Sequence, residues 1–464
     1  MNYFNRRTSM QKLRKPIVAM AIAMVASLSA SSVALAESAS GSGATFPQNF
    51  LASATVAFNQ ATGHNVSYAN PGGGSSKGKA DFKANLTDFG GTDSLVTTAQ
   101  AASFDWVYIP YVGGAISIAY RLDELAGQTL SLSQGTINGI FGGTIKKWND
   151  PSIANDMKTN PAWGNSLKKS GLKGASSVWS TPALNTALVT VTLTPSLLKS
   201  SKGKTVEIYD NKKKKAIKSA TVGTKGEISL QASVDSANNY TVKVAGKDVG
   251  KYAVTAVNLP DKAITVVYRS DGSGTTNNFC NFMKQSSNPD WAVNDAFTSC
   301  IPGGSAKVAS FGSTFQGQSG SANLSNYVAD TNGTIGYTEV SFVTDSTRAS
   351  KGIRSANVRN AAGKFVAPTS AGTSAFISGA SIDAKGFVTF NYSQATNLAA
   401  YPIVAITYGL GKTAKSAKNA VVSDFFTWIL TTYAPANAEA LGYAPLTGAI
   451  KTAAETQAKL INSK

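Results

Sequence analysis

Histidine and cysteine are scarce in this 464-residue sequence, which holds one histidine and two cysteines. The single histidine, His64, lies in the polar segment TGHN at 62–65. Hydrolytic triads and zinc sites both depend on histidine, so they are hard to build from this sequence. Composition leaves a Ser–Lys or carboxylate-pair enzyme open, but no motif points to one. We predict no catalytic site, no metal and no cofactor.

Long apolar runs are absent outside the first 36 residues. Those residues combine five basic side chains within positions 6–15, an apolar, small-residue run at 16–35 and the sequence Ala34-Leu35-Ala36. This order is typical of a secretory signal peptide with its cleavage site, and the cleavage pattern disfavours a transmembrane anchor. The residue directly after the predicted cleavage site is Glu37 and not cysteine, which disfavours a lipid anchor. We predict a signal peptide over 1–36 and a periplasmic or secreted protein.

The two cysteines, Cys280 and Cys300, are separated by 20 positions. In an oxidising compartment they can form a disulfide, which would contribute about 3 kcal/mol for a loop of this size. Two buried thiols are the alternative. Export favours the disulfide.

Acidic residues are few: 25, against 43 lysines and arginines, which gives a formal net charge of +18. Of this excess, +5 belongs to the first 36 residues and +10 to residues 162–257, leaving +3 for the rest. The basic character is therefore local, which argues against a nucleic-acid-binding protein. The run KKKK at 212–215 reads as a solvated hairpin turn. The functional alternative is a contact with an anionic polymer or membrane surface.

Apolar patterning divides the mature chain into two styles. Strand-like and helix-like segments alternate up to about residue 161, with a helix opening at Thr45 as N-cap, a helix at 80–85, strands at 106–110 and 115–120, and a helix at 133–141. This alternation predicts an α/β fold. Residues 162–257 instead show period-two alternation with frequent turn signals and no convincing helix, as in a small β-sandwich. The alternating runs predict strands at 189–193, 205–209, 228–232, 240–244 and 252–257. The pattern weakly resembles a bacterial immunoglobulin-like module. The α/β style resumes after Pro260.

Three predicted helices begin with glycine and hydroxyl residues. The sequence RSDGSGT at 269–275 follows an apolar strand and opens a helix, and similar starts lie at Thr45-Phe46 and at 74–76 (GSS). Helix N-termini offer free backbone N–H groups and a positive dipole, so three of them together suit a small oxyanion. One such start alone is as readily an ordinary N-cap and tight turn.

These motifs, together with GSGATFP at 41–47, DFGGTD at 88–93, IKKW at 145–148, GTIGY at 333–337 and YPI at 401–403, resemble the solute-binding proteins of the high-affinity phosphate ABC transporter. The resemblance covers the mature chain apart from about 162–257. It implies no enzyme, inorganic phosphate as ligand and a membrane ABC permease as partner. The phosphate ligands it implies are Thr45, Phe46, Ser75, Asp93, Arg269, Ser273, Gly274 and Thr275.

The chemistry of these side chains fits that ligand. The Arg269 guanidinium can bind two phosphate oxygens at once. The Asp93 carboxylate repels an anion unless the anion brings a proton to donate, as phosphate does and sulfate at neutral pH does not. A buried acceptor left unpaired should therefore reject sulfate. In isolation Asp93 would be a turn or N-cap aspartate.

Two departures from the family pattern stand out. Lys77-Gly78-Lys79 replaces the usual glycines, and Lys77 either adds charge at the site mouth or points into solvent. The β insertion at 162–257 is not standard, which raises an alternative: a surface or extracellular phosphate-binding protein whose basic insert attaches to an anionic polymer. A third interpretation, a nucleotide P-loop at 73–80, lacks the Ser or Thr that Mg²⁺ coordination needs, since residue 80 is alanine.

By resemblance, the fold is a two-lobed α/β periplasmic-binding-protein fold (type II) with an inserted all-β sandwich. Lobe one covers 37–111 and 402–464, lobe two covers 112–161 and 258–401, and the β module covers 162–257. The hinge lies near Tyr111 and Tyr401. Phosphate would enter between the lobes, which close over it and dock on the permease.

Overall fold

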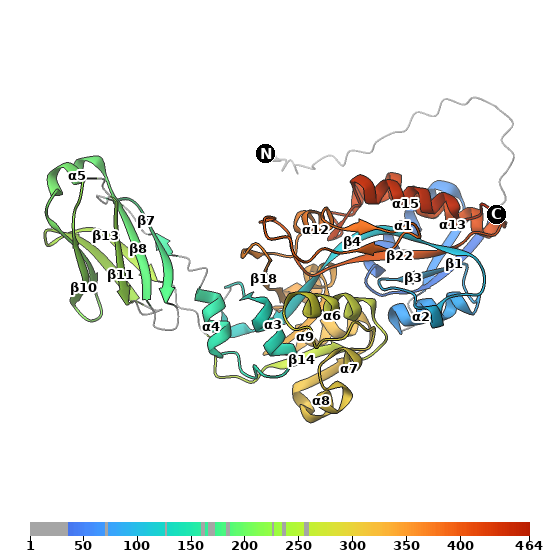
Figure 1. Ribbon diagram of the computed structural model, residues 1–464, viewed down its shortest axis with the longest axis horizontal. Coiled ribbons are helices and arrows are strands. Elements are labelled where there is room, and N and C mark those ends of the chain that lie inside the picture. The colour runs from blue at the N-terminus through green and yellow to red at the C-terminus, as the bar shows by residue number, and fades with distance from the viewer. Residues whose placement is uncertain are drawn as a thin grey trace, which may run out of the picture. The chain divides into compact units, whose positions relative to one another are not determined.

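The computed structural model describes residues 36–69, 73–125, 128–158, 163–165, 172–181, 186–224, 227–233, 238–254 and 259–464. We call the described residues of 36–158 and 259–464 the α/β body and those of 163–254 the β region (Figure 1). The predicted signal peptide lies outside the described residues, apart from Ala36.

The α/β body is built on one ten-stranded mixed sheet, in the order β15-β14-β16-β4-β22-β3-β1-β2, with β17 and β23 also paired to β4. The neighbours of β4 run antiparallel to it, whereas β14 pairs in parallel with β15 and β16, and β1 with β2 and β3. The strands are β1 Ser38–Gly43, β2 Asn65–Ala69, β3 Phe89–Thr92, β4 Trp106–Arg121, β14 Thr265–Arg269, β15 Phe315–Gln318, β16 Thr334–Glu339, β17 Arg354–Ser355, β22 Val404–Lys412 and β23 Tyr443–Ala444.

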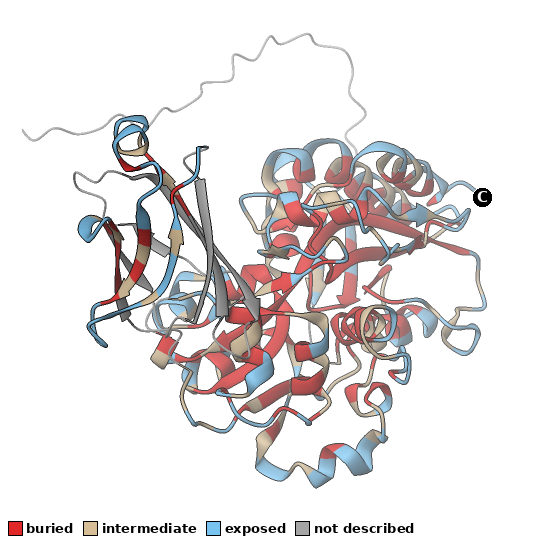
Figure 2. Ribbon diagram, turned by 60° about the vertical axis from the view of Figure 1, so that its left-hand side comes forward, coloured by how far each residue is buried: buried red, intermediate tan, exposed pale blue. Residues whose placement is uncertain are grey.

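Helices pack along this sheet, and the buried residues gather on the central strands and on the inward helix faces (Figure 2). The helices are α1 Gln48–Thr62, α2 Gly74–Lys83, α3 Gln134–Phe141, α4 Pro151–Lys158, α6 Gly274–Ser286, α7 Phe297–Cys300, α8 Gly304–Ser310, α9 Gly320–Asp330, α10 Val340–Thr344, α11 Ser346–Ser350, α12 Ser370–Ile377, α13 Ala417–Trp428, α14 Ala434–Asn437 and α15 Gly448–Leu460. Smaller pairings involve β5 Ser131–Leu132, β18 Asn357–Arg359, β19 Phe365–Val366, β20 Ser381–Ile382 and β21 Val388–Thr389.

Strand β4 corrects one prediction. The sequence predicts two strands joined through Gly113-Gly114, but the structure has one strand of 16 residues. Both glycines remain extended because each is paired on two sides, Gly113 with Ile406 and Ala444, and Gly114 with Ala405 and Tyr443. A glycine pair therefore does not break a strand whose neighbours continue the hydrogen-bonded ladder.

Two predicted helix starts are also wrong. Helix α2 begins at Gly74, not Ala80, because Gly73 takes the left-handed conformation (φ 85°) that turns the chain into the helix. Helix α1 has Pro47 as its N-cap, so Thr45 lies before the helix. The apolar spacing within residues 50–58 predicts that Val56 lies on the buried face of α1, but Val56 is 55% exposed. Helix α3 and its N-cap Ser133 confirm the prediction at 133–141.

The β region consists of a five-stranded sheet, β10-β9-β12-β13-β6, and a three-stranded sheet, β11-β8-β7. Apolar side chains from β8, β9 and β12 form one buried cluster. Its elements are β6 Trp163–Asn165, β7 Leu172–Thr181, β8 Thr186–Leu193, α5 Pro195–Ser201, β9 Thr205–Asp210, β10 Lys215–Thr221, β11 Glu227–Ser233, β12 Asn238–Val244 and β13 Lys247–Val254.

Five of these strands match predicted runs, although the end of the predicted run at 252–257 lies outside the described residues. The prediction of no helix is wrong, because Pro195 in the first turn starts the short helix α5. Residues 211–214 connect the antiparallel strands β9 and β10, so the lysine run is a hairpin turn, as predicted. Strand β10 escaped prediction because it is an edge strand exposed along most of its length.

Candidate functional site

The eight predicted site residues lie at the ends of strands and helices in the α/β body. Thr45 and Phe46 connect β1 to α1, and Ser75 is in the first turn of α2. Asp93 directly follows β3, Arg269 ends β14, and Ser273 caps α6 ahead of Gly274 and Thr275. All eight are buried; the exposed fractions of the polar side chains do not exceed 5%.

The N-termini of α2 and α6 meet at Asp93. The Ser75 hydroxyl donates to Asp93 Oδ2 (3.3 Å) and accepts from the Asp93 backbone N–H (3.1 Å). Gly274 lies so close that a Cβ there would stand 2.4 Å from Ser75 Oγ and 2.7 Å from Asp93 Cβ. Only glycine allows this approach, and it places the backbone of α6 against Asp93.

Arg269 is held in a fixed orientation by Asp271. Its Nε donates to Asp271 Oδ1 (2.6 Å), and its Nη2 donates to Asp271 Oδ2 (2.5 Å). Burial opposes the charge on Arg269, but the hydrogen bonds and charge of Asp271 raise the pKa of Arg269 above its usual value. Burial likewise opposes the charge on Asp271, whose pKa is lowered by Arg269. The remaining nitrogen, Nη1, donates to Ser321 Oγ (3.1 Å).

Ser321 connects Arg269 to Thr45. Its hydroxyl lies 3.1 Å from Thr45 Oγ1, and its backbone N–H donates to the same oxygen (3.3 Å). The prediction omitted Ser321 and Asp271. Gly320-Ser321 opens α9 with the same glycine–hydroxyl signature as the other three helix starts, and Asp271 lies within the RSDGSGT motif. Both signals were present in the sequence.

Asp93 carries a buried oxygen that lacks a partner. Among the described residues, Asp93 Oδ1 and Thr275 Oγ1 have no hydrogen-bond partner. Burial raises the pKa of Asp93 to about 7. The hydroxyl groups of Thr407 and Ser75 and the positive charge of Arg269 act in the opposite direction and lower that pKa. An unpaired buried acceptor costs about 1–3 kcal/mol, so it favours a ligand that can donate a hydrogen bond.

Glu339, at the end of β16, is a second buried carboxyl group. Its Oε2 accepts from Thr338 Oγ1 (3.1 Å), and burial raises the pKa of Glu339 to about 8. Arg269 is near enough for its charge to oppose that rise. No sequence motif marks Glu339, because a glutamate at a strand end belongs to no recognisable pattern.

Comparison with known proteins shows the superfamily to which the chain belongs. A family model described as "PBP superfamily domain" matches residues 29–259 and 246–432. The chain belongs to the PBP superfamily.

Two sequence relatives align with this superfamily member over most of its length. "Phosphate-binding protein PstS" of Xylella fastidiosa (strain 9a5c) is 24% identical over 394 residues, which cover 84% of this chain and 76% of the relative. The protein of the same name from Haemophilus influenzae is 25% identical over 430 residues, covering 92% and 94%. The solved structure "Phosphate-Binding Protein from Stenotrophomonas maltophilia" aligns with a TM-score of 0.49 and 17% identity, covering 90% of this chain and 93% of that one.

The structure excludes a P-loop in this PBP superfamily member. A P-loop places its glycine-rich segment ahead of a helix so that backbone N–H groups surround a phosphate. Here Gly78 and Lys79 lie inside α2, and the Lys79 ammonium is paired with Asp295 (2.7 Å). Lys77 pairs with Asp81 on the same helix, and its side chain is 41% exposed.

Cys280 and Cys300 form a disulfide, with Cα atoms 6.1 Å apart. The bond joins α6, which begins at the predicted anion site, to α7. Both residues are buried.

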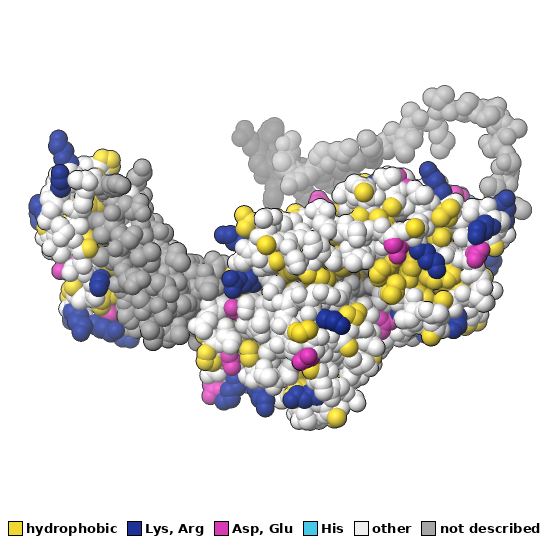
Figure 3. Space-filling model, in the orientation of Figure 1, with side chains coloured by type: hydrophobic (Ala, Val, Ile, Leu, Met, Phe, Trp, Pro, Cys, Tyr) yellow, Lys and Arg dark blue, Asp and Glu magenta, His cyan; other side chains and the backbone are white. Residues whose placement is uncertain are grey.

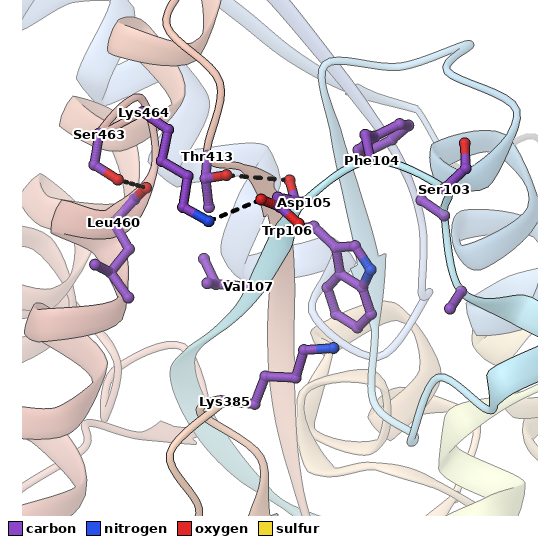
Figure 4. A pocket seen from close by; sticks show the side chains of 12 residues that line it. Ser103, Phe104, Asp105, Trp106, Val107, Lys385, Thr413, Leu460, Ser463 and Lys464 are labelled. Atoms are coloured by element: carbon purple, nitrogen blue, oxygen red, sulfur yellow. Dashed lines mark hydrogen bonds and ion pairs between the residues drawn. The ribbon is translucent and has the colours of Figure 1, made fainter.

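A cavity of about 370 Å³ in the α/β body contains none of the predicted site residues (Figure 4). Its Lys464 donates to Asp105 Oδ2 (2.8 Å), and Lys385 Nζ lies 4.3 Å from the centre of the Trp106 ring. The charged groups of the cavity are thus already engaged.

Within the described ranges no cluster of three metal-ligating side chains occurs. In the same part of the chain, no helix has the length and hydrophobicity to cross a bilayer.

Proposed function

We propose that this protein is an exported solute-binding protein that captures inorganic phosphate between two lobes and delivers it to a membrane ABC permease. The observation that carries the proposal is Asp93, a buried carboxyl with an unpaired oxygen beside a fixed arginine and two helix N-termini. The relatives named as phosphate-binding proteins support it. Catalysis has no part in the proposal.

Each predicted phosphate-binding residue has a defined role in this proposal. Arg269 Nη1 turns from Ser321 to a phosphate oxygen while Asp271 keeps the guanidinium plane in place. The hydroxyls of Thr45, Ser75, Ser273 and Thr275 and the backbone N–H groups of Phe46 and Gly274 replace the hydration shell of the anion. Asp93 Oδ1 accepts a hydrogen bond from the P–OH group that phosphate carries and that sulfate at neutral pH lacks.

The proposed lobes are residues 37–111 with 402–464 and residues 112–161 with 258–401. Contacts between them support a closed arrangement: the Ser76 N–H donates to Gly272 O (2.9 Å), and Asn278 Nδ2 donates to Asp93 O (2.6 Å). Strand β4 runs from one proposed lobe into the other, near the proposed hinge at Tyr111 and Tyr401. Closure of this kind would bury the anion and present a docking surface to the permease.

Calorimetric titration tests the function directly. The mature protein, stripped of bound anion by reversible unfolding and dialysis, is titrated with phosphate and then with sulfate at pH 8. We expect tight phosphate binding and no sulfate binding. Binding of neither anion, or equal binding of both, would refute the proposal.

We propose a separate role for the β region, as an inserted immunoglobulin-like sandwich that attaches to an anionic surface polymer. The specific observation is its exposed charge (Figure 3). Asp248 is its one acidic side chain of the exposed class among those the structure describes there. The exposed lysines are Lys199, Lys202, Lys204, Lys212, Lys213, Lys214, Lys215, Lys218 and Lys247.

Dextran sulfate, immobilised and probed in the presence of saturating phosphate, tests this attachment. We expect retention that is lost at 0.5 M salt, because exposed charges are screened over a few ångströms at that ionic strength. A variant with serine at 212–214 should elute earlier and bind phosphate normally. Unchanged retention of the variant would refute the role of the lysine run.

Export is proposed from residues 1–36, and the mature protein is placed in the periplasm or outside the cell. Fractionation of the native host distinguishes the two functions proposed here. Release in a soluble periplasmic fraction supports transport, whereas retention on the envelope that salt reverses supports attachment.

A further inference from the structure

Lys79 is a lysine whose side chain is 2% exposed, on α2, about one turn before the end of that helix. Its ammonium has three partners. It donates to Asp295 Oδ2 (2.7 Å), Ser94 Oγ (3.0 Å) and Leu95 O (3.2 Å). Ser94 and Leu95 directly follow Asp93, so Lys79 holds the segment that carries the candidate anion acceptor.

Asp295 precedes α7 and is fixed from two sides. From α2, Ser76 Oγ donates to its Oδ2 (2.9 Å) together with Lys79. From α6, Asn277 Nδ2 donates to its Oδ1 (3.0 Å), and the Ser273 backbone N–H donates to its carbonyl oxygen (2.9 Å). The carboxylate therefore joins the first turns of the two helices that meet at Asp93.

We propose that the Lys79–Asp295 pair is a latch between the two proposed lobes, which stabilises the closed form and thereby sets the affinity for phosphate. By the proposed boundaries Lys79 lies in lobe one and Asp295 in lobe two. The inference rests on the proposed function. Lys79 acts as a positioning residue: it contacts Asp93's neighbours and not the anion.

Whether the buried Lys79–Asp295 pair stabilises or destabilises the closed form depends on how many of its hydrogen bonds are satisfied. Burying an ion pair costs desolvation energy, which is recovered only where the geometry is good and the remaining donors and acceptors are satisfied. Lys79 has three acceptors for its three N–H bonds, and both Asp295 oxygens accept hydrogen bonds. Opening the lobes would separate these groups, so the pair favours closure.

Lys79 also compensates a charge that would oppose anion binding. Asp295 is near enough to Asp93 for its negative charge to raise the pKa of Asp93. Without Lys79, that carboxylate would be uncompensated beside the anion site. The same substitution would therefore weaken both closure and the local electrostatic field.

Lys77 is a matched control on the same helix. It pairs with Asp81 one turn further along, and its side chain is 41% exposed. Both members of this pair belong to α2, so the pair is made whether the lobes are open or closed. Exposed pairs of this kind contribute little to stability.

The test compares Lys79→Met, Asp295→Asn, the double variant and Lys77→Met by phosphate titration and by small-angle scattering without and with phosphate. We expect Lys79→Met and Asp295→Asn each to weaken phosphate binding roughly tenfold. A change of this size lies within the usual range for the coupling between a conformational equilibrium and ligand affinity. The radius of gyration without phosphate should increase in both. The double variant should lose less than the product of the two single losses, Lys79→Arg should recover part of the affinity, and Lys77→Met should match the wild type.

Wild-type affinity and an unchanged radius of gyration in Lys79→Met would overturn the latch. If Lys79→Met does not fold, the double variant, which leaves no unpaired charge, gives the same comparison with Lys77→Met. If the wild type binds no phosphate, the proposed function fails. The scattering comparison without phosphate still decides whether the pair holds the lobes together.

Discussion

Asp93 in the α/β body and Asp210 in the β region are both buried aspartates, but their carboxylate oxygens differ in their hydrogen-bond partners. Asp210 Oδ1 accepts from the backbone N–H groups of Lys212 and Lys213 (2.9 and 2.8 Å), which belong to its own hairpin. Asp93 Oδ1 has no partner among the described residues. A buried acid satisfied by its own turn has a structural role, whereas an unsatisfied one beside an arginine can still accept a hydrogen bond, which is why we propose it as a ligand contact.

The two regions also differ in where most of their charged side chains lie. The buried cluster of the β region is apolar, apart from the Tyr240 hydroxyl, and most of the lysines described in that region face solvent (Figure 3). The α/β body brings Arg269, Asp271, Asp93 and Glu339 into its interior. Such burial is costly unless the groups are paired or serve a ligand. The following experiments test whether this difference separates function from architecture.

Arg269→Met should have the largest effect. It removes the proposed phosphate contact of Arg269 Nη1 and leaves Asp271 buried without its partner. We expect at least a 1,000-fold loss of phosphate affinity and a loss of about 3–5 kcal/mol of unfolding free energy. Titration calorimetry and urea denaturation measure the two. Arg359→Met, at an exposed position, is the control. Phosphate affinity within tenfold of wild type would contradict the assignment.

Asp93→Asn should reverse the discrimination between anions. The amide offers a donor in place of an acceptor-only group, so we expect about a 100-fold loss of phosphate affinity together with measurable sulfate binding. Competition titrations at pH 8 measure both. Asp105→Asn changes an exposed aspartate paired with Lys464 and should leave both anions unaffected. If Asp93→Asn still excludes sulfate, Asp93 is not the selective residue.

Removing the disulfide should lower stability without altering the choice of anion. The double variant Cys280→Ala/Cys300→Ala opens a loop of 20 residues, and we expect a loss of about 3 kcal/mol in unfolding free energy. Urea denaturation of this variant, and of wild type with and without reductant, gives the value. Equal stability of oxidised and reduced wild type would contradict the expected contribution.

Acidity should weaken the rejection of sulfate. The pKa of Asp93 is raised to about 7, so Asp93 is mainly ionised at pH 8 and mainly protonated at pH 6. The protonated form can donate to sulfate. We expect sulfate affinity to rise about tenfold between these pH values, following the protonated fraction. The Asp93→Asn variant should show no such dependence. A flat profile in the wild type would refute this role of the proton.

Asp210→Ala should have the smallest effect and should confine it to the β region. The substitution removes the acceptor for two turn N–H groups, and we expect a loss of about 1 kcal/mol in the stability of that region. Hydrogen exchange of the β9–β10 hairpin measures it. Phosphate affinity should remain at the wild-type value; a decrease would show that the two regions are coupled.

The sequence was most informative where local chemistry repeats. The glycine–hydroxyl pattern located the starts of α2 and α6 and the buried segment just ahead of α1, and the same pattern at Gly320-Ser321 was overlooked. The role of Lys79 could not be predicted, because its partner Asp295 lies 216 positions away. The continuity of β4 through two glycines depends on β22 and β23, which lie near the other end of the chain. Local preference predicts elements, and distant partners decide their bounds and charges.

Strand β4 also determines when the protein can fold. Its central neighbours are β16 and β22, which are synthesised more than 200 and nearly 300 residues later. The middle of the sheet therefore cannot form until almost the whole chain exists, and pairings of such high contact order form slowly. For a chain proposed to leave the cytoplasm, this delay is useful, because the polypeptide remains threadable until its last strands have been made.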